Sequence, residues 1–453
     1  MLMRRAPLAF VVMVGCLLAA CEKGAWHPTA QDGSKEKLKI KYFWAPSDSD
    51  HHYSSVRTAI EAAQGSDEFK KVDPYVELSE YKDSGSQEDA IQEARILRRS
   101  PDVLAVIGHP RSGATLAALP FYAQAGIPVL IPSATSPYLL YRHAEGEIPD
   151  FSATRPDLEP PRFANAFRLT PSDIPDQAHA LELTIKQLGK DRKIKTPKVM
   201  LICDSTGGTR SSTYSKPMCD YLASEAGDAY DFAITVSRNV DLEKGNISGV
   251  ITEIHAEDPN FIVLVGYQEL ARALLEELKE RADRDMPHKK IENYTLIMPD
   301  ACLTNDLIDF GAQVYVTSPM NPQRAVACTS PRGEAYSEAL KFQRASEKVV
   351  GIPETDEGFV YDSVLILAAA VDDCNQSGDL NRGCVLRYLN KHHTNLLGAC
   401  ESYHIEQGER QNAYYYVYAQ HVQGKQREMR PRWFTRKEDH ELYPSDSWDQ
   451  QSH

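Results

Sequence analysis

The chain has 453 residues, of which 42% are hydrophobic and 25% charged, and its formal net charge is −14. This composition is typical of a globular protein with sizeable cores, and the length predicts two or three domains. Because an acidic surface repels phosphate backbones, the charge disfavours nucleic acid as a partner.

The chain begins with the pattern of an export signal. Arg4 and Arg5 precede an apolar run from Ala6 to Ala20, which is too short to cross a bilayer comfortably. Cys21 follows directly after Leu18-Ala19-Ala20, and this arrangement resembles a bacterial lipobox. We therefore expect residues 1–21 to be a lipoprotein signal peptide, with lipid at Cys21 anchoring the protein in the periplasm or at the cell surface. An ordinary signal peptide with a chance cysteine is the alternative.

Residues 22–35 are polar and include two glycines and a proline, which predicts a flexible tether. Beyond the tether, short apolar runs typical of strands alternate with amphipathic runs typical of helices. Strands are expected over 38–43, 75–81, 103–107 and 129–131, and helices over 55–63, 87–97 and 115–125. Such alternation favours a parallel sheet with helices on both faces.

A second set of the same units starts after Asp173, which predicts two α/β lobes. In it, strands are expected over 198–203, 232–236, 261–265 and 294–298, and helices over 216–225, 247–255 and 268–282. Between the two sets, residues 142–162 carry four prolines among acids and predict an irregular surface insertion.

Seven of the nine cysteines lie beyond Cys21: Cys203, Cys219, Cys302, Cys328, Cys374, Cys384 and Cys400. An odd number in an exported chain predicts disulfides with at least one thiol left over. Cys374 and Cys384 flank a turn-rich loop that could close a bridge. No pair has CxxC spacing, so we favour structural disulfides over zinc and expect no metal or cofactor.

Three segments carry a resemblance to a known family: VIGHPRS at 106–112, AGIPVLIPSATSP at 125–137 and FRLTPSD at 167–173. They resemble the type 1 periplasmic binding proteins, and most of all the branch that binds leucine, isoleucine and valine for ABC transporters. Weaker motifs follow in the family's order at 265–267, 298–300, 361–362 and 398–408, so the resemblance spans residues 37–425.

The resemblance implies an α/β fold of two Rossmann-like lobes, joined by three hinge crossovers, with the ligand between them. The first lobe would comprise residues 36–172 and 318–395, the second 173–317 and 396–440, and a polar tail 441–453. It further implies a monomer that captures a small molecule and passes it to an ABC permease.

The segment from Gly108 to Gly113 lies between a strand and a helix, where backbone N–H groups and the Ser112 hydroxyl form an anion site. Ser133, Ala134 and Thr135 repeat this arrangement after the next strand. The resemblance implies that Ser112 and Thr135 bind the ligand's carboxylate, and that the carbonyl region of Ser133 meets its ammonium. The alternative is that Ser112 and Thr135 only cap helices.

The resemblance also implies ligand contacts in the second lobe. Asp300 would pair with an ammonium group, and Tyr267 would line the cleft. Receptors for branched-chain amino acids have glutamate at the position of Asp300, so this arm is one methylene shorter. A larger ligand or a bridging water would fill the difference. The alternatives are an acid in a loop and an ordinary packed tyrosine.

Two residues mark departures from the family's pattern. Tyr53 falls where the family's first loop contacts ligand, but here that loop is charged and lacks the usual glycine. Arg111 precedes Ser112, and its guanidinium could bind a second carboxylate or a phosphate. The ligand is therefore expected to be amino-acid-like or amide-like, and acidic or polar. Arg111 facing water is the alternative.

Neither a G-x-S-x-G nucleophile turn nor a G-x-x-x-x-G-K-[ST] phosphate loop occurs in the chain, so we expect no enzymatic activity. The sequence thus predicts a lipid-anchored solute-binding protein for uptake by an ABC transporter. A sensor or regulatory lipoprotein of the same fold, acting on a membrane or cell-wall partner, is the alternative, and an exported hydrolase is a weaker one.

Overall fold

The computed structural model describes residues 36–44, 50–141, 162–206, 213–226, 232–284, 290–302, 307, 310–319, 357–398, 402–411, 414–423, 426–436 and 441–444. The chain divides into two compact units, Met1–Lys37 and Leu38–His453, and all elements below belong to the second unit. Cys21, the tether over 22–35 and most of the predicted insertion lie outside the described residues.

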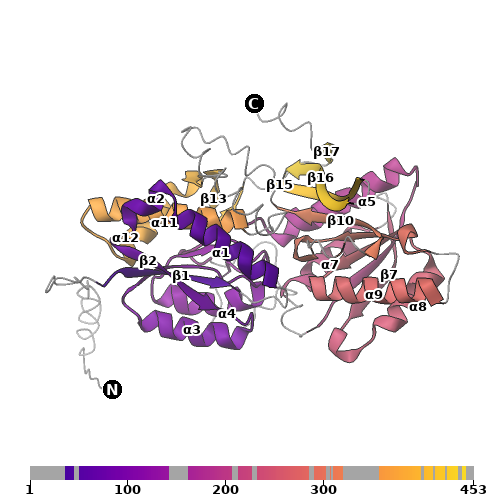
Figure 1. Cartoon of the computed structure of the whole chain (residues 1–453), viewed down its shortest axis with the longest axis horizontal. Helices are drawn as coiled ribbons and strands as arrows, with labels where there is room; N and C mark the ends of the chain where they lie inside the picture. Colours follow the sequence, from indigo (N-terminus) through magenta and orange to yellow (C-terminus); the bar gives the residue numbers. More distant parts are fainter. Residues whose placement is uncertain are drawn as a thin grey trace, which may run out of the picture. The chain divides into compact units, whose positions relative to one another are not determined.

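The first sheet has five strands in the order β2-β1-β3-β4-β5, and all neighbours are parallel (Figure 1). Its strands are β1 (Leu38–Trp44), β2 (Val76–Lys82), β3 (Val103–Ile107), β4 (Val129–Ile131) and β5 (Ala166–Arg168). Side chains along a strand alternate between two cores. Ile40, Tyr42 and Trp44 belong to one core, whereas Phe43, between Tyr42 and Trp44, belongs to the other.

Helices cover both faces of this sheet, as the alternation in the sequence predicted. One core is shared by α1 (Asp50–Gln64), α2 (Asp67–Val72), α11 (Glu357–Gln376) and α12 (Arg382–His392), and the other by α3 (Gln87–Arg99) and α4 (Ser112–Gln124). Helix α3 shows why these segments are helical. The Ser86 hydroxyl accepts the N–H of Asp89 at its start, and basic residues occupy its last turn, where they complement the helix dipole.

The second sheet has eight strands in the order β17-β16-β15-β10-β9-β8-β6-β7. Its parallel part contains β6 (Lys198–Asp204), β7 (Ala233–Val240), β8 (Phe261–Val265), β9 (Thr295–Met298) and β10 (Gln313–Ser318). Three antiparallel strands extend it: β15 (Tyr414–Gln423), β16 (Gln426–Arg436) and β17 (Tyr443–Pro444).

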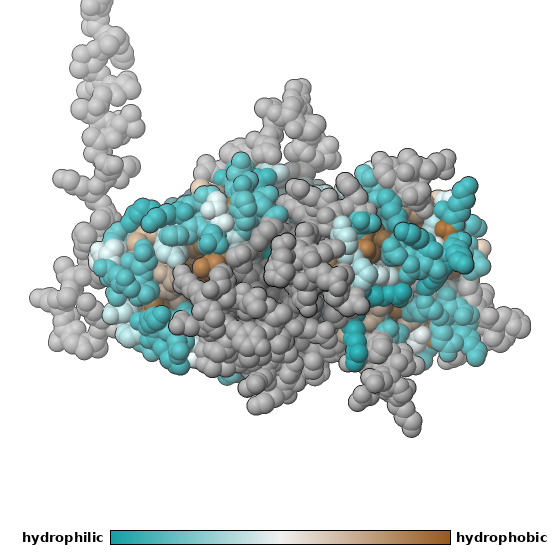
Figure 2. Space-filling view, turned by 90° about the horizontal axis from the view of Figure 1, so that it is seen from above, coloured by the Kyte–Doolittle hydropathy of each residue, from teal (hydrophilic) through white to brown (hydrophobic). Residues whose placement is uncertain are grey.

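Two pairs of helices cover the second sheet (Figure 1). Helices α5 (Ala178–Asp191) and α7 (Ser215–Glu225) contribute to one core, and α8 (Ile247–Glu257) and α9 (Gln268–Arg284) to the other. Hydrophilic residues cover much of the described surface in Figure 2. No helix in the described part of the chain is long and apolar enough to span a membrane.

The chain passes between the two sheets three times. It leaves the first sheet after β5 through the irregular turn η2 (Asp173–Gln177) and returns between β10 and α11. It passes again between β14 (Glu409–Arg410) and β15. These passages, the parallel first sheet and the parallel part of the second sheet confirm the predicted fold class.

The structure corrects two of the predicted boundaries. Leu396, Tyr403 and Ile405 pack in the core of the first sheet, so residues 396–410 do not belong to the second lobe as predicted. At the other end, Leu442 is buried and Tyr443–Pro444 pair with β16, so the predicted polar tail is wrong for these residues. In both cases the buried residues belong to short apolar segments within polar sequence, which gave no clear periodic pattern.

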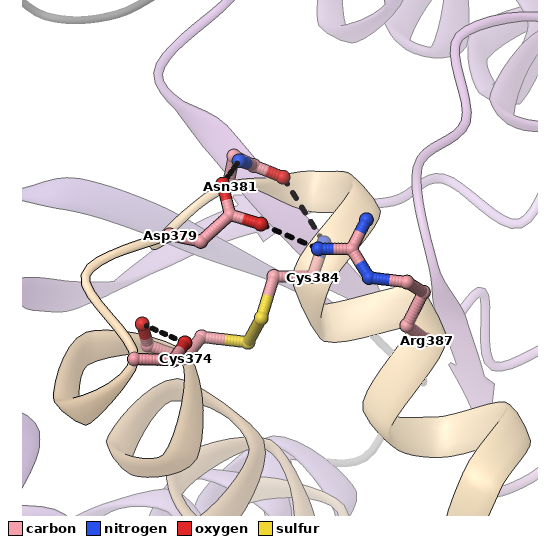
Figure 3. The surroundings of a disulfide bond; sticks show 6 residues. Cys374, Asp379, Asn381, Cys384 and Arg387 are labelled. Atoms are coloured by element: carbon pink, nitrogen blue, oxygen red, sulfur yellow. Dashed lines mark hydrogen bonds and ion pairs between the residues drawn. A yellow bond between two sulfur atoms is a disulfide. The ribbon is translucent and has the colours of Figure 1, made fainter.

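Two disulfides staple helices to their neighbours. Cys374 and Cys384 join α11 to α12, as the turn-rich loop suggested, and Asp379, Asn381 and Arg387 brace that loop with hydrogen bonds (Figure 3). Cys203 and Cys219 join β6 to α7. Cys302 is a buried free thiol, in keeping with the predicted odd cysteine. Cys328 and Cys400 lie outside the described residues.

We expect the disulfide between Cys203 and Cys219 to be worth about 3 kcal/mol, because it closes a loop with a sequence separation of 16. The double variant Cys203→Ala/Cys219→Ala should lose about this much unfolding free energy in urea titrations. The matched variant Cys374→Ala/Cys384→Ala should lose slightly less, since its loop is shorter. Insensitivity of the wild-type midpoint to reducing agent would contradict both expectations.

Candidate functional site

Ser112 lies at the carboxyl end of β3, as the first residue of α4, and is buried. Its Oγ accepts the N–H of Ser136, from the segment after β4, at 3.2 Å. Arg111, not Ser112, is the N-cap residue of α4, and it makes no side-chain capping bond. The alternative role of Ser112 as a helix cap is therefore wrong. Accepting from Ser136 leaves the Ser112 hydroxyl free to donate its own proton.

The second predicted segment of the first lobe follows β4. Ala134 and Thr135 are buried, and Ser133 is half-buried. A turn over 137–140 follows instead of a helix, so this segment does not repeat the strand-to-helix arrangement that we predicted, and Thr135 caps no helix. The Thr135 carbonyl instead accepts from the backbone N–H of Asp173, at 2.8 Å, and from the Arg168 guanidinium.

A buried histidine holds the loop before Ser112 in place. His109 Nδ1 lies 2.7 Å from Asp83 Oδ2, and its Nε2 lies 2.9 Å from the hydroxyl of Tyr122 on α4. The backbone N–H of Asp83 donates to the carbonyl of Trp44 at the end of β1. The ends of β1, β2 and β3 are thereby tied together, which fixes the start of the helix that carries Ser112.

In the second lobe, Asp300 follows β9 and is anchored through one oxygen. Its Oδ1 accepts hydrogen bonds from Gln177 Nε2 at 2.7 Å, from the Tyr214 hydroxyl at 2.8 Å and from the backbone N–H of Ala301 at 2.9 Å. No bond to Oδ2 is found among the described residues, and this oxygen is not enclosed. One carboxylate oxygen thus fixes the orientation of the side chain, and the other is free to bind.

Asp173 lies beside Asp300 and is completely buried. Burial raises its pKa well above the usual range, and repulsion from Asp300 adds to the shift, while Thr135 and Arg168 oppose it. Neither of its carboxyl oxygens has a hydrogen bond of good geometry in the described part of the molecule. Burial also raises the pKa of Asp300, against the hydrogen bonds from Gln177 and Tyr214.

Two tyrosines form an aromatic wall next to these acids. The rings of Tyr214 and Tyr267 pack with centroids 4.9 Å apart. Burial, followed by the charges of Asp300 and Asp173, raises the pKa of Tyr214 well above its usual value. Its hydroxyl therefore stays protonated and keeps donating to Asp300 across the physiological range.

Three of the predicted site residues, Ser112, Thr135 and Asp300, are linked through residues that were not predicted. Ser112 contacts Ser136, Thr135 contacts Asp173, and Asp173 lies within electrostatic reach of Asp300. The two cavities with described linings lie elsewhere: one of about 350 Å³ beside β5 and one of about 390 Å³ beside α5. No group of His, Cys, Asp and Glu in the described residues is placed to hold a metal.

Two predicted residues stand apart from this network. The structure places the backbone of Tyr53 inside α1, which begins at Asp50, so the expected loop at this position is wrong. The Arg111 side chain packs over Gly85, where a Cβ would come within 2.5 Å of its Cδ. Its guanidinium therefore lies over the loop that follows β2. Contact of Arg111 with a ligand stays a prediction.

Sequence reasoning missed Asp173, Gln177, Tyr214 and Arg168 as site residues. Asp173 and Gln177 lie in the motif that carried the resemblance, but no pattern indicates that their side chains converge on Asp300. Tyr214 could have been found from its place just before a helix that follows a buried strand, where parallel sheets gather their ligand residues.

The match to a known family decides the identity of the chain. The family described as periplasmic binding protein matches residues 55–425, most of the sequence. The chain belongs to the periplasmic binding protein family. No curated protein matches this binding protein in sequence.

Solved structures of type 1 binding proteins share its fold. The leucine-binding protein LivK of Thermotoga maritima has a TM-score of 0.62 and 18% identity, with 90% of this chain and 99% of that chain covered. LivJ of Streptococcus pneumoniae, in complex with isoleucine, has a TM-score of 0.59 and 17% identity, with 87% of this chain and 100% of that chain covered. A solute-binding protein of Rhodopseudomonas palustris, in complex with 3,4-dihydroxybenzoic acid, has a TM-score of 0.63 and 13% identity, with 91% of this chain and 99% of that chain covered. At these identities, the likeness shows the fold alone.

The raised pKa of Asp173 gives a test by substitution. Between its unfolded and its native pKa, a carboxyl with a raised native pKa binds more protons in the folded state than in the unfolded state. The free energy of unfolding is therefore not reduced by this group at low pH, and it falls as the pH rises from the unfolded pKa to the native pKa. Asp173→Asn should therefore raise the melting temperature of the ligand-free protein by about 1–2 °C at pH 8. This gain should shrink towards pH 4. Exposed Asp373→Asn is the control, and a gain independent of pH would contradict the assignment.

Proposed function

We propose that the binding protein captures a small amino-acid-like zwitterion outside the cytoplasm and delivers it to an ABC permease. The single observation that carries this proposal is the coordination of Asp300. Three donors on Oδ1 hold the carboxylate rigidly, while Oδ2 stays open to a positively charged ligand group. Burial raises the pKa of the neighbouring Asp173 well above its usual range, so this carboxyl favours its neutral form and leaves Asp300 as the acid that would meet an ammonium.

The other end of the ligand would meet the first lobe. The backbone at the start of α4 offers N–H groups and the positive end of a helix dipole, and the Ser112 hydroxyl adds a further donor. A carboxylate is the group that such donors favour. The wall formed by Tyr214 and Tyr267 would pack against the ligand's side chain.

The ligands of the similar structures support the carboxylate end of this proposal. Isoleucine and 3,4-dihydroxybenzoic acid share a carboxylate, whereas only isoleucine carries an ammonium. In this chain Asp300 offers a carboxylate that would pair with the ammonium group, which an amino acid has and this aromatic acid lacks. We therefore infer an amino acid, rather than an aromatic acid, as the ligand.

A ligand titration tests this proposal. Thermal-shift screening with the proteinogenic amino acids should find at least one that raises the melting temperature, and calorimetry should then give its Kd. Asp300→Asn should weaken its binding about 10- to 100-fold, because a charged hydrogen bond is lost, and Ser112→Ala about 10-fold. Asn390→Ala, in the unrelated cavity beside β5, is the matched control. Equal binding by Asp300→Asn would overturn the proposal.

We further propose that lipid at Cys21 holds the protein at a membrane, on the strength of the lipobox resemblance. Cells expressing Cys21→Ser should release the protein into the soluble fraction, whereas the wild type should remain with membranes. Cys16→Ser, within the apolar run, is the matched control and should leave the wild type's distribution unchanged. Wild-type protein recovered without acyl chains by mass spectrometry would contradict the anchor.

A further inference from the structure

A strongly basic segment interrupts this acidic chain. Residues 186–198, at the end of α5 and the start of β6, carry six basic residues and a single acid, a net charge of +5. The whole chain has a net charge of −14. We call this segment the α5 basic surface; its basic residues are Lys186, Lys190, Arg192, Lys193, Lys195 and Lys198.

The charges of this surface are exposed and largely unpaired. All of its basic residues except Lys186 are exposed, and Lys186 pairs with Glu182 on the same helix. The lysines at 190, 193, 195 and 198 form no ion pair with any residue that the structure describes. Four uncompensated positive charges therefore face the solvent within nine residues of sequence.

The one acid of the segment, Asp191 at the end of α5, pairs with a residue of strand β16. Asp191 accepts from Gln187 and lies 3.3 Å from the guanidinium of Arg432 on β16, which brings a further positive charge to the surface. Arg192 donates to Thr295 Oγ1 and Gln313 Oε1, which are both neutral. Its position is thus fixed while its charge remains uncompensated.

This surface lies away from the candidate ligand site. Arg192 contacts Thr295 and Gln313, the first residues of β9 and β10, and its guanidinium lies over Phe261, the first residue of β8. It therefore belongs to the amino edge of the parallel strands, whereas Asp300 follows the carboxyl end of β9. Figure 1 shows α5 beside β16 and β17. Ligand capture leaves this surface without a role.

Helix capping does not account for the surface either. Basic side chains in the last turn of a helix complement its dipole, and Lys190 fits this explanation. The effect falls off within that turn, however, and Lys193, Lys195 and Lys198 lie beyond the end of α5.

A cavity of about 390 Å³ opens among these charges. Its rim contains Lys186, Lys190 and Lys195 together with one acid, Glu441, and its apolar lining includes Leu183, Ile194, Pro197 and Leu442. An anionic headgroup with an adjoining apolar part matches this combination of charged rim and apolar lining. Lysines on flexible stems act as point charges and need no fixed partner geometry, which suits a fluid lipid surface.

We propose that the α5 basic surface rests against anionic phospholipid headgroups; its role at the membrane rests on the lipid anchor proposed above. Each lysine or arginine near such a surface contributes about 1 kcal/mol. Charges farther than about 8–10 Å are screened, so distant acids weaken this attraction little, whereas Glu182 and Glu441 lie close enough to offset part of the positive charge. Residues 22–37 between Cys21 and the folded unit can extend roughly 50 Å, which leaves the folded unit free to lie on the bilayer.

Vesicle binding tests this proposal without the anchor. The Cys21→Ser chain should sediment with vesicles containing about 30% phosphatidylglycerol, but not with pure phosphatidylcholine, and the binding should weaken as salt rises. The variant Lys190→Glu/Lys193→Glu/Lys195→Glu should bind the anionic vesicles at least about 10-fold more weakly. Lys70→Glu/Lys71→Glu/Lys391→Glu makes the same charge change at exposed positions elsewhere and should bind as before.

Three results would overturn the proposal: equal binding to neutral and anionic vesicles, equal loss in both triple variants, or no vesicle binding at low salt. The last result would assign the surface to an acidic protein partner instead. Circular dichroism melts of both variants exclude misfolding as the cause of a loss. Calorimetry with the amino acid found by screening should give the same Kd for all three chains. Failure of that screen would count against the ligand site and not against the lipid surface.

Discussion

The arrangement of the candidate site depends on one buried guanidinium. Arg168 has no exposed surface, and its Nη1 donates to the carbonyls of Thr135 and Ser136 at 2.9 and 2.6 Å. On its other side it pairs with Glu409 of β14. Removing one partner of a buried ion pair typically costs about 3–5 kcal/mol, because the other charge is left uncompensated. Arg168 thereby fixes the segment after β4 relative to two of the passages between the sheets.

Neighbouring contacts extend this fastening along both passages. Arg410 donates to the carbonyl of Leu169, and the Tyr415 hydroxyl donates to the carbonyl of Ser172. At Gly408 the backbone has a φ of +83°, and a Cβ would lie 2.6 Å from the carbonyl of Ala166. Only glycine allows so close an approach. The passage through 408–415 is thus bonded to the passage through 166–172, and both end beside Asp173 and Asp300.

The sequence was sufficient for the fold because hydrophobic periodicity is a local property. Runs such as Val103–Ile107 and Phe261–Val265 are continuous and apolar, and the structure makes them central strands buried on both faces. The errors occurred where local pattern was weak. Tyr443–Pro444 forms a strand by pairing with the edge of β16, and so short a segment carries no local pattern that predicts this partner.

The site was less predictable, because it is made by convergence. Ser112 and Asp300 could be named because the motifs around them resemble a known family. The contacts that give them chemical meaning come from Tyr214, Gln177 and Arg168, which lie far apart in sequence from the residues that they hold. Arg111 illustrates the same limit, since its place beside Ser112 in the sequence did not indicate that its side chain packs over Gly85. Sequence adjacency fixes where a backbone is, but packing decides where a long side chain points.

The second lobe separates its charges between the two edges of one sheet. Asp173 and Asp300 lie beyond the carboxyl ends of its strands, where burial raises the pKa of both carboxyls and three hydrogen bonds to Oδ1 support the ionised form of Asp300. The lysines of the α5 basic surface stand in solvent at the amino ends, where screening limits them to contacts within about 10 Å. Buried charge suits the recognition of one small cation, and exposed charge suits a broad anionic surface. The proposed ligand site and the proposed lipid contact thus lie at opposite edges of one sheet.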